Sequence, residues 1–230
     1  MRLDCRHLNF TYPGSTVPVI DDLSFTMENP GFKALFGPSG VGKTSLAKII
    51  ATGERAGGDR VSLTGIGTIL YSYNLERLPG WSSVGNHLDK VTPSDKSDLK
   101  KELVEIFEMA PLLGSRFSQL SMGQQNRVNL IRYLLQSFDL LILDESLANV
   151  DEKLREKIIL AIKAIFPDKM FLYISHNLME VAKFCSQILV FGKSVKDRKS
   201  SMVQGQDLSR TDQMDKLALD RTILEIMNAF

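Results

Sequence analysis

The N-terminal third of the chain alternates short apolar stretches with turn residues. Apolar or alternating stretches at 3–12, 17–27 and 33–36 have the length and pattern of strands, and the turn sequences YPGS and ENPG separate them. A fourth strand-like stretch at 61–72 is broken by two glycines. We therefore expect a β-rich N-terminal part.

The rest of the chain alternates helical and strand periods. At 94–110 apolar residues recur on one helix face among mixed charges, which predicts a solvated helix. A second helix is predicted at 124–135, and the all-apolar stretch 140–143 suits a strand buried on both faces of a parallel sheet. Four further elements follow: a helix at 151–165, a strand at 170–174, a helix at 177–184 and a strand at 187–191. This alternation predicts a parallel α/β sheet.

Two C-terminal stretches complete the pattern. Residues 193–201 are basic and polar without an apolar face, which predicts a solvated loop rather than a binding patch. Residues 207–230 end in a helical pattern of apolar positions, and we expect this helix to pack on the body of the protein.

The sequence GPSGVGKT at 37–44 lies between a predicted strand and a stretch with helical spacing. Two glycines five apart, followed by lysine and a hydroxyl residue, fit a phosphate-binding loop, because glycines let backbone N–H groups turn toward phosphate oxygens. In such a loop Lys43 reaches the terminal phosphates and Thr44 reaches magnesium. An ordinary glycine-rich turn is the alternative. The predicted nucleotide-contacting residues here are Gly37, Pro38, Ser39, Gly40, Val41, Gly42, Lys43, Thr44 and Ser45.

A pair of carboxylates follows the apolar stretch 140–143. The sequence LLILDE places Asp144 and Glu145 at the C-terminal end of a buried strand, which is where ligands bind in open α/β sheets. Asp144 is placed to hold Mg²⁺, and Glu145 to orient or deprotonate a water near the γ-phosphate. An acidic helix cap is the alternative, but the upstream phosphate loop favours the catalytic interpretation.

Composition and charge limit the partners and the cellular compartment that the chain can have. A net charge of +1 gives no general attraction for nucleic acid or acidic membranes. Cys5 and Cys185 are far apart and lack metal-ligand spacing, so we expect free thiols in a reducing compartment. The N-terminus lacks the apolar core of a signal peptide, and no apolar run approaches the roughly 20 residues that cross a bilayer. We expect one cytoplasmic domain.

Residues 120–127, LSMGQQNR, resemble the signature sequence of the ABC ATPases. The family form is LSGGQ before a glutamine-rich helix start; this chain keeps Leu120, Ser121, Gly123 and Gln124 but has Met122 where the first glycine is expected. Taken alone, these residues predict a helix start that offers a hydroxyl and N–H groups to an anion, or a plain helix cap. The resemblance implies that Ser121, Gly123 and Gln124 contact the nucleotide of an opposing subunit.

Three further positions resemble family residues in the expected order. Tyr12 resembles the aromatic residue that stacks on adenine, and His176 resembles the switch histidine that contacts the γ-phosphate. Residues 149–151, of which Asp151 matches best, resemble the segment after the catalytic glutamate that meets the opposing subunit. Without the resemblance, Tyr12 is interpreted as a core residue, Asp151 as a helix cap and His176 as a polar residue at a strand end.

One family element is poorly matched. The glutamine expected after the strand near residue 70 is absent, and Asn74 offers a shorter amide in its place. The sequence LPGWSSVGNHL at 78–88 resembles a stretch that follows in importer subunits. Trp81 is therefore expected either to face a membrane partner or to pack within a small helical lobe.

The resemblance spans about residues 3–191 and implies a single ABC ATPase domain of the α/β class. Its parts are a P-loop NTPase core with a mostly parallel sheet, an N-terminal antiparallel β subdomain and a small helical subdomain. On this basis the core with the β subdomain comprises 1–72 and 139–192, the helical subdomain with the signature comprises 73–138, and a C-terminal tail comprises 193–230.

The resemblance also implies an ATPase that binds ATP and Mg²⁺ between two head-to-tail copies. Lys43, Glu145 and His176 would be catalytic, and Thr44 and Asp144 would hold the metal. The implied partners are a second copy or a paralogous ATPase subunit, an integral membrane permease and, as a further candidate, a solute-binding protein, with no nucleic acid. The chain would lie in the cytoplasm, peripheral on the inner face of the cell membrane through the permease, and would drive uptake of a small solute.

Alternative functions stay open. A soluble ABC ATPase of repair or translation usually carries two cassettes or long insertions, which this chain lacks. A module that clamps ATP without hydrolysing it is suggested by Met122 and by the missing glutamine. A small-molecule kinase with a phosphate loop would not need LSMGQQNR.

Overall fold

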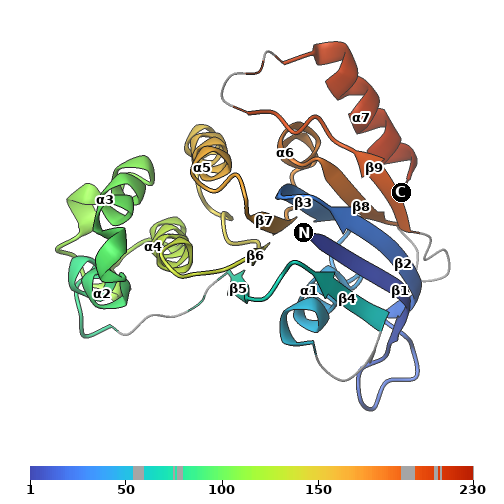
Figure 1. Cartoon of the computed structure of the whole chain (residues 1–230), viewed down its shortest axis with the longest axis horizontal. Coiled ribbons are helices and arrows are strands. Elements are labelled where there is room, and N and C mark those ends of the chain that lie inside the picture. The colour runs from blue at the N-terminus through green and yellow to red at the C-terminus, as the bar shows by residue number, and fades with distance from the viewer. Residues whose placement is uncertain are drawn as a thin grey trace.

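The computed structural model describes residues 1–53, 60–74, 76, 80–192, 200–209, 212 and 214–229, so most of the predicted basic loop lies outside the described residues. Figure 1 shows the arrangement of the elements. The strands are β1 (Arg2–Phe10), β2 (Ile20–Glu28), β3 (Gly31–Phe36), β4 (Val61–Thr64), β5 (Ile69–Tyr73), β6 (Leu140–Asp144), β7 (Met170–Ile174), β8 (Gln187–Phe191) and β9 (Ser200–Gln204). The helices are α1 (Lys43–Thr52), α2 (Val84–Val91), α3 (Ser97–Ile106), α4 (Met122–Leu134), α5 (Glu152–Ile165), α6 (Leu178–Phe184) and α7 (Lys216–Asn228).

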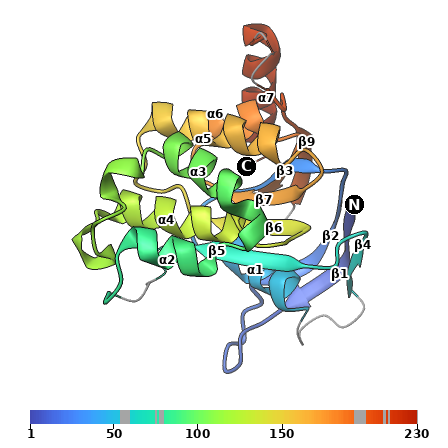
Figure 2. The same cartoon turned by 60° about the vertical axis from the view of Figure 1, so that its left-hand side comes forward.

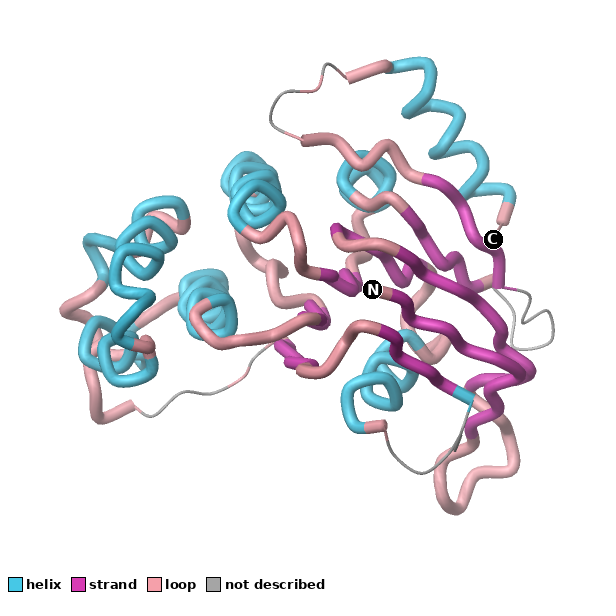
Figure 3. The backbone as a smooth tube through the Cα atoms, viewed as in Figure 1, coloured by secondary structure: helices cyan, strands magenta, loops and turns pink. Residues whose placement is uncertain are grey.

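The strands of the described part form two sheets (Figure 3). The larger sheet has the order β5–β6–β7–β3–β8–β9, and its neighbouring strands are parallel except for the antiparallel pair β8–β9. The smaller sheet has the order β2–β1–β4 and is antiparallel. This architecture confirms the predicted α/β class, with a mostly parallel sheet and an N-terminal antiparallel sheet.

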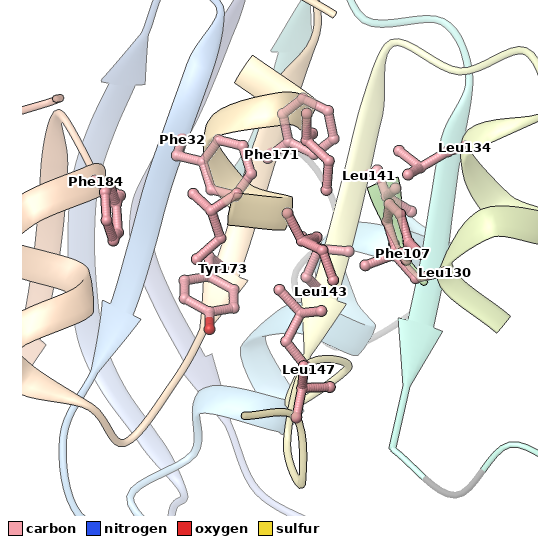
Figure 4. Packing of buried hydrophobic residues seen from close by; sticks show 14 of the residues in the cluster. Phe32, Phe107, Leu130, Leu134, Leu141, Leu143, Leu147, Phe171, Tyr173 and Phe184 are labelled. Atoms are coloured by element: carbon pink, nitrogen blue, oxygen red, sulfur yellow. The ribbon is translucent and has the colours of Figure 1, made fainter. Parts of the chain in front are cut away.

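Two apolar clusters cover the two faces of the larger sheet. On one face, side chains such as Phe32 and Phe171, whose rings stack with 4.7 Å between centroids, pack against helices α3 to α6 (Figure 4). On the other face, Leu35 packs with Leu46 of α1 and with Leu3 of the smaller sheet. Because successive strand residues point to opposite faces, a strand covered on both sides must be apolar throughout, as the sequence of β6 is.

Helices α2, α3 and α4 gather to one side of the larger sheet (Figures 1 and 2). Helix α2 is not among the predicted helices. Its apolar residues Val84, Leu88 and Val91 do recur at helical spacing, but eight residues are too few for that period to be distinctive in the sequence. Ser83 caps it by accepting a hydrogen bond from the backbone N–H of Asn86 (3.2 Å).

Some predicted boundaries were wrong. The predicted loop 193–201 ends in strand β9, whose pairing with β8 the polar sequence did not indicate. The helical pattern expected at the end of 207–230 is helix α7, which begins at Lys216, where Asp215 accepts hydrogen bonds from the N–H groups of Leu217 (2.9 Å) and Ala218 (3.2 Å). Helix α7 packs on α6 and β9, as expected for a helix that covers the body of the protein.

Three further expectations concern the two cysteines, Trp81 and membrane-spanning segments. Cys5 and Cys185 are both free and buried. Trp81 is 83% exposed, so it does not pack within the helical lobe. In the part of the chain that the structure describes, no helix is both long and apolar enough to cross a membrane.

Candidate nucleotide-binding site

The predicted site residues follow three parallel strands of the larger sheet. The glycine-rich loop joins β3 to α1, Asp144 ends β6, and His176 follows β7. Strands β6, β7 and β3 are adjacent in that order. The structure therefore brings these residues together at one edge of the sheet, where the carboxyl ends of parallel strands form ligand sites.

The glycine-rich loop has a backbone that requires glycine. Gly37, Gly40 and Gly42 have φ values of 152°, 83° and 105°, which other residues rarely adopt. A Cβ atom at Gly37 would lie 2.9 Å from the Cβ of Phe191, and one at Gly42 would lie 3.0 Å from Cγ1 of Val19. The loop therefore packs closely against Phe191 and Val19. It leads directly into the N-terminus of α1, and a helix N-terminus favours anions.

Lys43 lies folded over this loop. Its Nζ donates hydrogen bonds to the carbonyl oxygens of Gly37 (2.8 Å) and Pro38 (2.7 Å), and the residue is only 5% exposed. Burial lowers the pKa of the Lys43 ammonium, and the nearby carboxylates of Glu145 and Asp144 oppose this shift. The loop thus places a cation within the ring of backbone groups that would surround a phosphate.

A cavity of about 330 Å³ joins the start of α1 to the end of β6. Thr44, Lys48, Asp144 and Glu145 line it, together with Tyr71, Tyr73 and Asn74 of the β5 end. Among the described residues no group of three or more His, Cys, Asp or Glu side chains could hold a metal by itself. A hydroxyl and a carboxylate on one cavity do suit Mg²⁺, which usually binds one or two carboxylates together with substrate phosphates.

Asp144 has a hydrogen-bond partner that the sequence did not indicate. The hydroxyl of Tyr71 in β5 donates to Oδ2 of Asp144 (2.6 Å). Burial, followed by the hydrogen bond to Asp144, raises the pKa of the Tyr71 phenol well above its usual value, so the phenol stays protonated and remains a donor.

Glu145 and His176 contact each other across the ends of β6 and β7. Nε2 of His176 lies 2.5 Å from Oε1 of Glu145. Glu145 has a φ of 54°, and its backbone N–H donates to the Ile174 carbonyl (3.2 Å). Both side chains line a cavity of about 600 Å³. A carboxylate and an imidazole are thus held together at an open surface, where either group can serve in general acid–base chemistry.

The turn that carries His176 is fixed by a buried carboxylate. Glu180, in the first turn of α6, is 2% exposed. It accepts hydrogen bonds from the hydroxyl of Tyr173 (2.8 Å), the hydroxyl of Ser175 (3.2 Å) and the amide of Asn177 (3.1 Å). These contacts join the end of β7 to α6, so the backbone on either side of His176 is held in place. No sequence motif had indicated this role for Glu180.

The signature residues form the start of α4. Ser121 caps the helix by accepting from the backbone N–H of Gln124 (3.3 Å), whose side chain accepts from the Ser121 N–H (2.8 Å). Gly123 packs against the backbone of Asn149, and Met122 is 52% exposed. These residues are not among those that line the cavities at the phosphate loop, Asp144 and His176. Their predicted contact with nucleotide therefore needs a second chain.

Tyr12 lies beside the start of α1, and Asp151 lies at the start of α5. The Tyr12 hydroxyl lies 2.8 Å from the Ser45 hydroxyl, and its ring meets Phe10 edge-on at 4.8 Å between centroids. Tyr12 is 46% exposed beside the first turn of α1 and is not a core residue. Asp151 caps α5 by accepting from two backbone N–H groups, those of Lys153 (3.0 Å) and Leu154 (3.3 Å).

An apolar cavity of about 250 Å³ adjoins the tip of the phosphate loop, and the sequence did not indicate it. Its walls come from the loop before β2, from the phosphate loop and from the end of β8. Val17, Pro18 and Val19, predicted to belong to the second strand, lie in this loop instead. An apolar wall beside a phosphate site suits the ring of a nucleotide.

Comparison with known proteins gives the family. The model described as ABC transporter matches residues 20–148, more than half of the chain, and the chain belongs to this family. The molybdenum import ATP-binding protein ModC of Saccharophagus degradans is 27% identical over 231 residues, covering 87% of this chain and 64% of its own length. The spermidine/putrescine import ATP-binding protein PotA of Mannheimia succiniciproducens is 28% identical over 209 residues, covering 83% and 55%.

The chain thus spans less than two thirds of the length of these relatives. A solved structure of a bacterial Atm1-family ABC exporter with ATP bound superimposes with a TM-score of 0.74 at 17% identity, over 99% of this chain and 41% of that one. At this identity the likeness shows the fold alone.

Proposed function

We propose that this chain is the ATP-binding subunit of an ABC transporter, which hydrolyses ATP between two head-to-tail copies and drives uptake of a small solute through a separate permease. The observation that supports this best is the placement of Lys43, Asp144 and the Glu145–His176 pair at one sheet edge, beside open cavities. The names of the relatives, which are import ATP-binding proteins, support the direction of transport.

Each residue of the proposed site has its own role in binding or hydrolysis. The N–H groups of the loop and Lys43 bind the phosphates, and Thr44 and Asp144 would hold Mg²⁺. The metal neutralises charge on the phosphates when it is bound. Glu145 orients a water and accepts its proton, while His176 holds the Glu145 carboxylate in place and faces the γ-phosphate. Ser121, Gly123 and Gln124 of the opposing copy complete the site, with Asp151 near the same interface.

The first test removes the proposed base. Glu145→Gln keeps the size of the side chain but removes its basicity, so ATP binding should persist while hydrolysis falls by about 10² to 10⁴. That loss corresponds to roughly 3 to 5 kcal/mol of activation free energy. Glu152→Gln, at an exposed position at the start of α5, is the matched control and should hydrolyse ATP at the wild-type rate. Unchanged turnover in Glu145→Gln would reject the assignment.

The second part of this test asks whether each site is shared between two copies. Ser121→Tyr should keep the start of α4 of that copy from closing over the nucleotide of its partner, and should abolish turnover without loss of nucleotide binding to the monomer. Mixing this variant with Glu145→Gln creates mixed pairs in which one of the two sites has both Glu145 and Ser121 intact. Turnover should therefore reappear on mixing, although each variant alone is inactive. A mixture as inactive as its components would exclude a head-to-tail pair.

A further inference from the structure

Strand β5 presents two tyrosines to the cavity at the end of β6. In the parallel register of β5 and β6, Tyr73 lies opposite Asp144 and Tyr71 lies opposite Ile142. Residues two apart on a strand share a face, and the two rings stack with 5.9 Å between centroids. Only the Tyr71 hydroxyl reaches the carboxylate of Asp144, at 2.6 Å from Oδ2.

This contact constrains the carboxylate that would hold the metal. Asp144 is 7% exposed, and within the described part of the chain its side chain accepts a hydrogen bond from the Tyr71 hydroxyl. A donor on Oδ2 fixes the rotation of the carboxylate and leaves Oδ1 for the cavity. Mg²⁺ demands near-ideal octahedral geometry, so a ligand that is already oriented loses less freedom when the metal binds.

We propose that Tyr71 is a positioning residue for Mg²⁺ binding, acting through its hydrogen bond to Asp144. The inference rests on the proposed function, because it assigns Asp144 to the metal. Tyr71 acts on the orientation of the carboxylate and does not itself touch the metal or the phosphates. Its ring packs on Tyr73 whether or not the hydroxyl is present, which allows the two contributions to be separated.

The experiment compares binding of AMP-PNP, a slowly hydrolysed ATP analogue, to the full chain in excess EDTA and in Mg²⁺. The ratio of the two dissociation constants gives the contribution of the metal without any turnover. In Tyr71→Phe this ratio should fall by about tenfold, the effect typical of residues that orient metal ligands, while the affinity in EDTA stays at the wild-type value. Tyr73→Phe is the matched control, since it removes a hydroxyl from the same face and the same ring pair.

The outcomes separate the inference from the proposed function. If the wild-type chain binds AMP-PNP neither in EDTA nor in Mg²⁺, the proposed function fails. If Mg²⁺ tightens binding equally in wild type and Tyr71→Phe, only the inference is overturned. Equal losses in Tyr71→Phe and Tyr73→Phe also overturn it, because ring packing would then explain the effect.

A second measurement covers the case in which Tyr71→Phe also weakens binding in EDTA. Urea unfolding of wild type, Tyr71→Phe, Asp144→Asn and the double variant, all without metal, gives the coupling between the two side chains. Tyr71→Phe should destabilise the wild-type chain more than the Asp144→Asn chain. Additive effects would show that the hydroxyl does not act through Asp144 and would overturn the inference.

Discussion

Gly123 shows that a signature residue can be required within its own chain. A Cβ atom at this position would lie 2.1 Å from the carbonyl oxygen of Asn149 and 2.9 Å from its carbonyl carbon. Both atoms belong to the backbone and cannot rotate away. The start of α4 is therefore in direct contact with the loop between β6 and α5, before any second copy or nucleotide is considered.

This contact gives a prediction for the single chain. Gly123→Ala should lower the free energy of unfolding by about 1 to 3 kcal/mol, as overpacking usually does, although alanine is the better helix former. Gly114→Ala is the control, because a Cβ there meets no atom within 4 Å. Urea unfolding without nucleotide measures the free energy of unfolding of both variants. Equal stability of the two variants would show that the contact tolerates a methyl group, and that glycine at 123 serves the interface alone.

At the residue scale, the sequence revealed only what a local motif encodes. GPSGVGKT and LLILDE carry Lys43, Thr44, Asp144 and Glu145 in short stretches whose spacing reflects their chemistry. The Tyr71–Asp144 contact joins residues 73 positions apart, and its existence depends on the register of two strands. Contacts of that kind have no signal in a single sequence.

At the element scale, Asp139 ties the entry of β5 to the entry of β6. Its Oδ2 accepts hydrogen bonds from the backbone N–H groups of Gly67 and Thr68 (2.9 Å each), and Lys169 lies 3.2 Å from Oδ1. The hydrogen bond from Thr68, then that from Gly67, and then Lys169 lower the pKa of the Asp139 carboxyl. The charged form therefore stabilises the fold.

The sign of this shift predicts a pH dependence. A lowered folded-state pKa contributes stability above the unfolded value of about 3.9, and this contribution is lost as the pH falls through the folded pKa. Asp139→Asn should therefore be less stable than wild type at pH 7, and the difference should shrink below about pH 4. Asp168→Asn, an exposed neighbour of Lys169, serves as control. Urea unfolding between pH 7 and about pH 4 measures this difference in the free energy of unfolding. A difference that does not depend on pH would contradict the charge argument.

Elements were predictable where burial was complete. Strands β7 (Met170–Ile174) and β8 (Gln187–Phe191) match their predicted bounds, because two buried faces leave a continuous apolar run. Strand β9 was missed because it lies at the edge of the sheet, where only Val203 is buried. Helix α2 was missed because it is only eight residues long, which is shorter than the window over which a helical period can be recognised.

At the scale of the whole molecule, hydrogen bonds tie helix α4 to the end of β5 and to Glu76. Asn126 donates to the side chain of Asn74 at the end of β5 (2.9 Å). Asn129 donates to the Glu76 carbonyl (2.7 Å), and the Tyr133 hydroxyl donates to the Glu76 carboxylate (2.8 Å). Asn74 also lines the cavity beside Asp144, so these contacts connect that cavity to helix α4.

Trp81 offers a test of whether the surface beside α2 meets a membrane partner. It is the single tryptophan of the chain and lies exposed just before α2, of which only Val84 and Leu88 are buried. If this face meets the permease, Trp81→Ala should weaken that association by about 30-fold or more, as loss of a tryptophan hot spot typically does, with nucleotide binding intact. Leu217→Ala on α7, an apolar residue that is 73% exposed and lies away from α2, should not. The measurement is recovery of a multi-span membrane protein with the tagged chain from detergent-solubilised membranes. Equal recovery with both variants would show that the exposed indole does not contribute to this association.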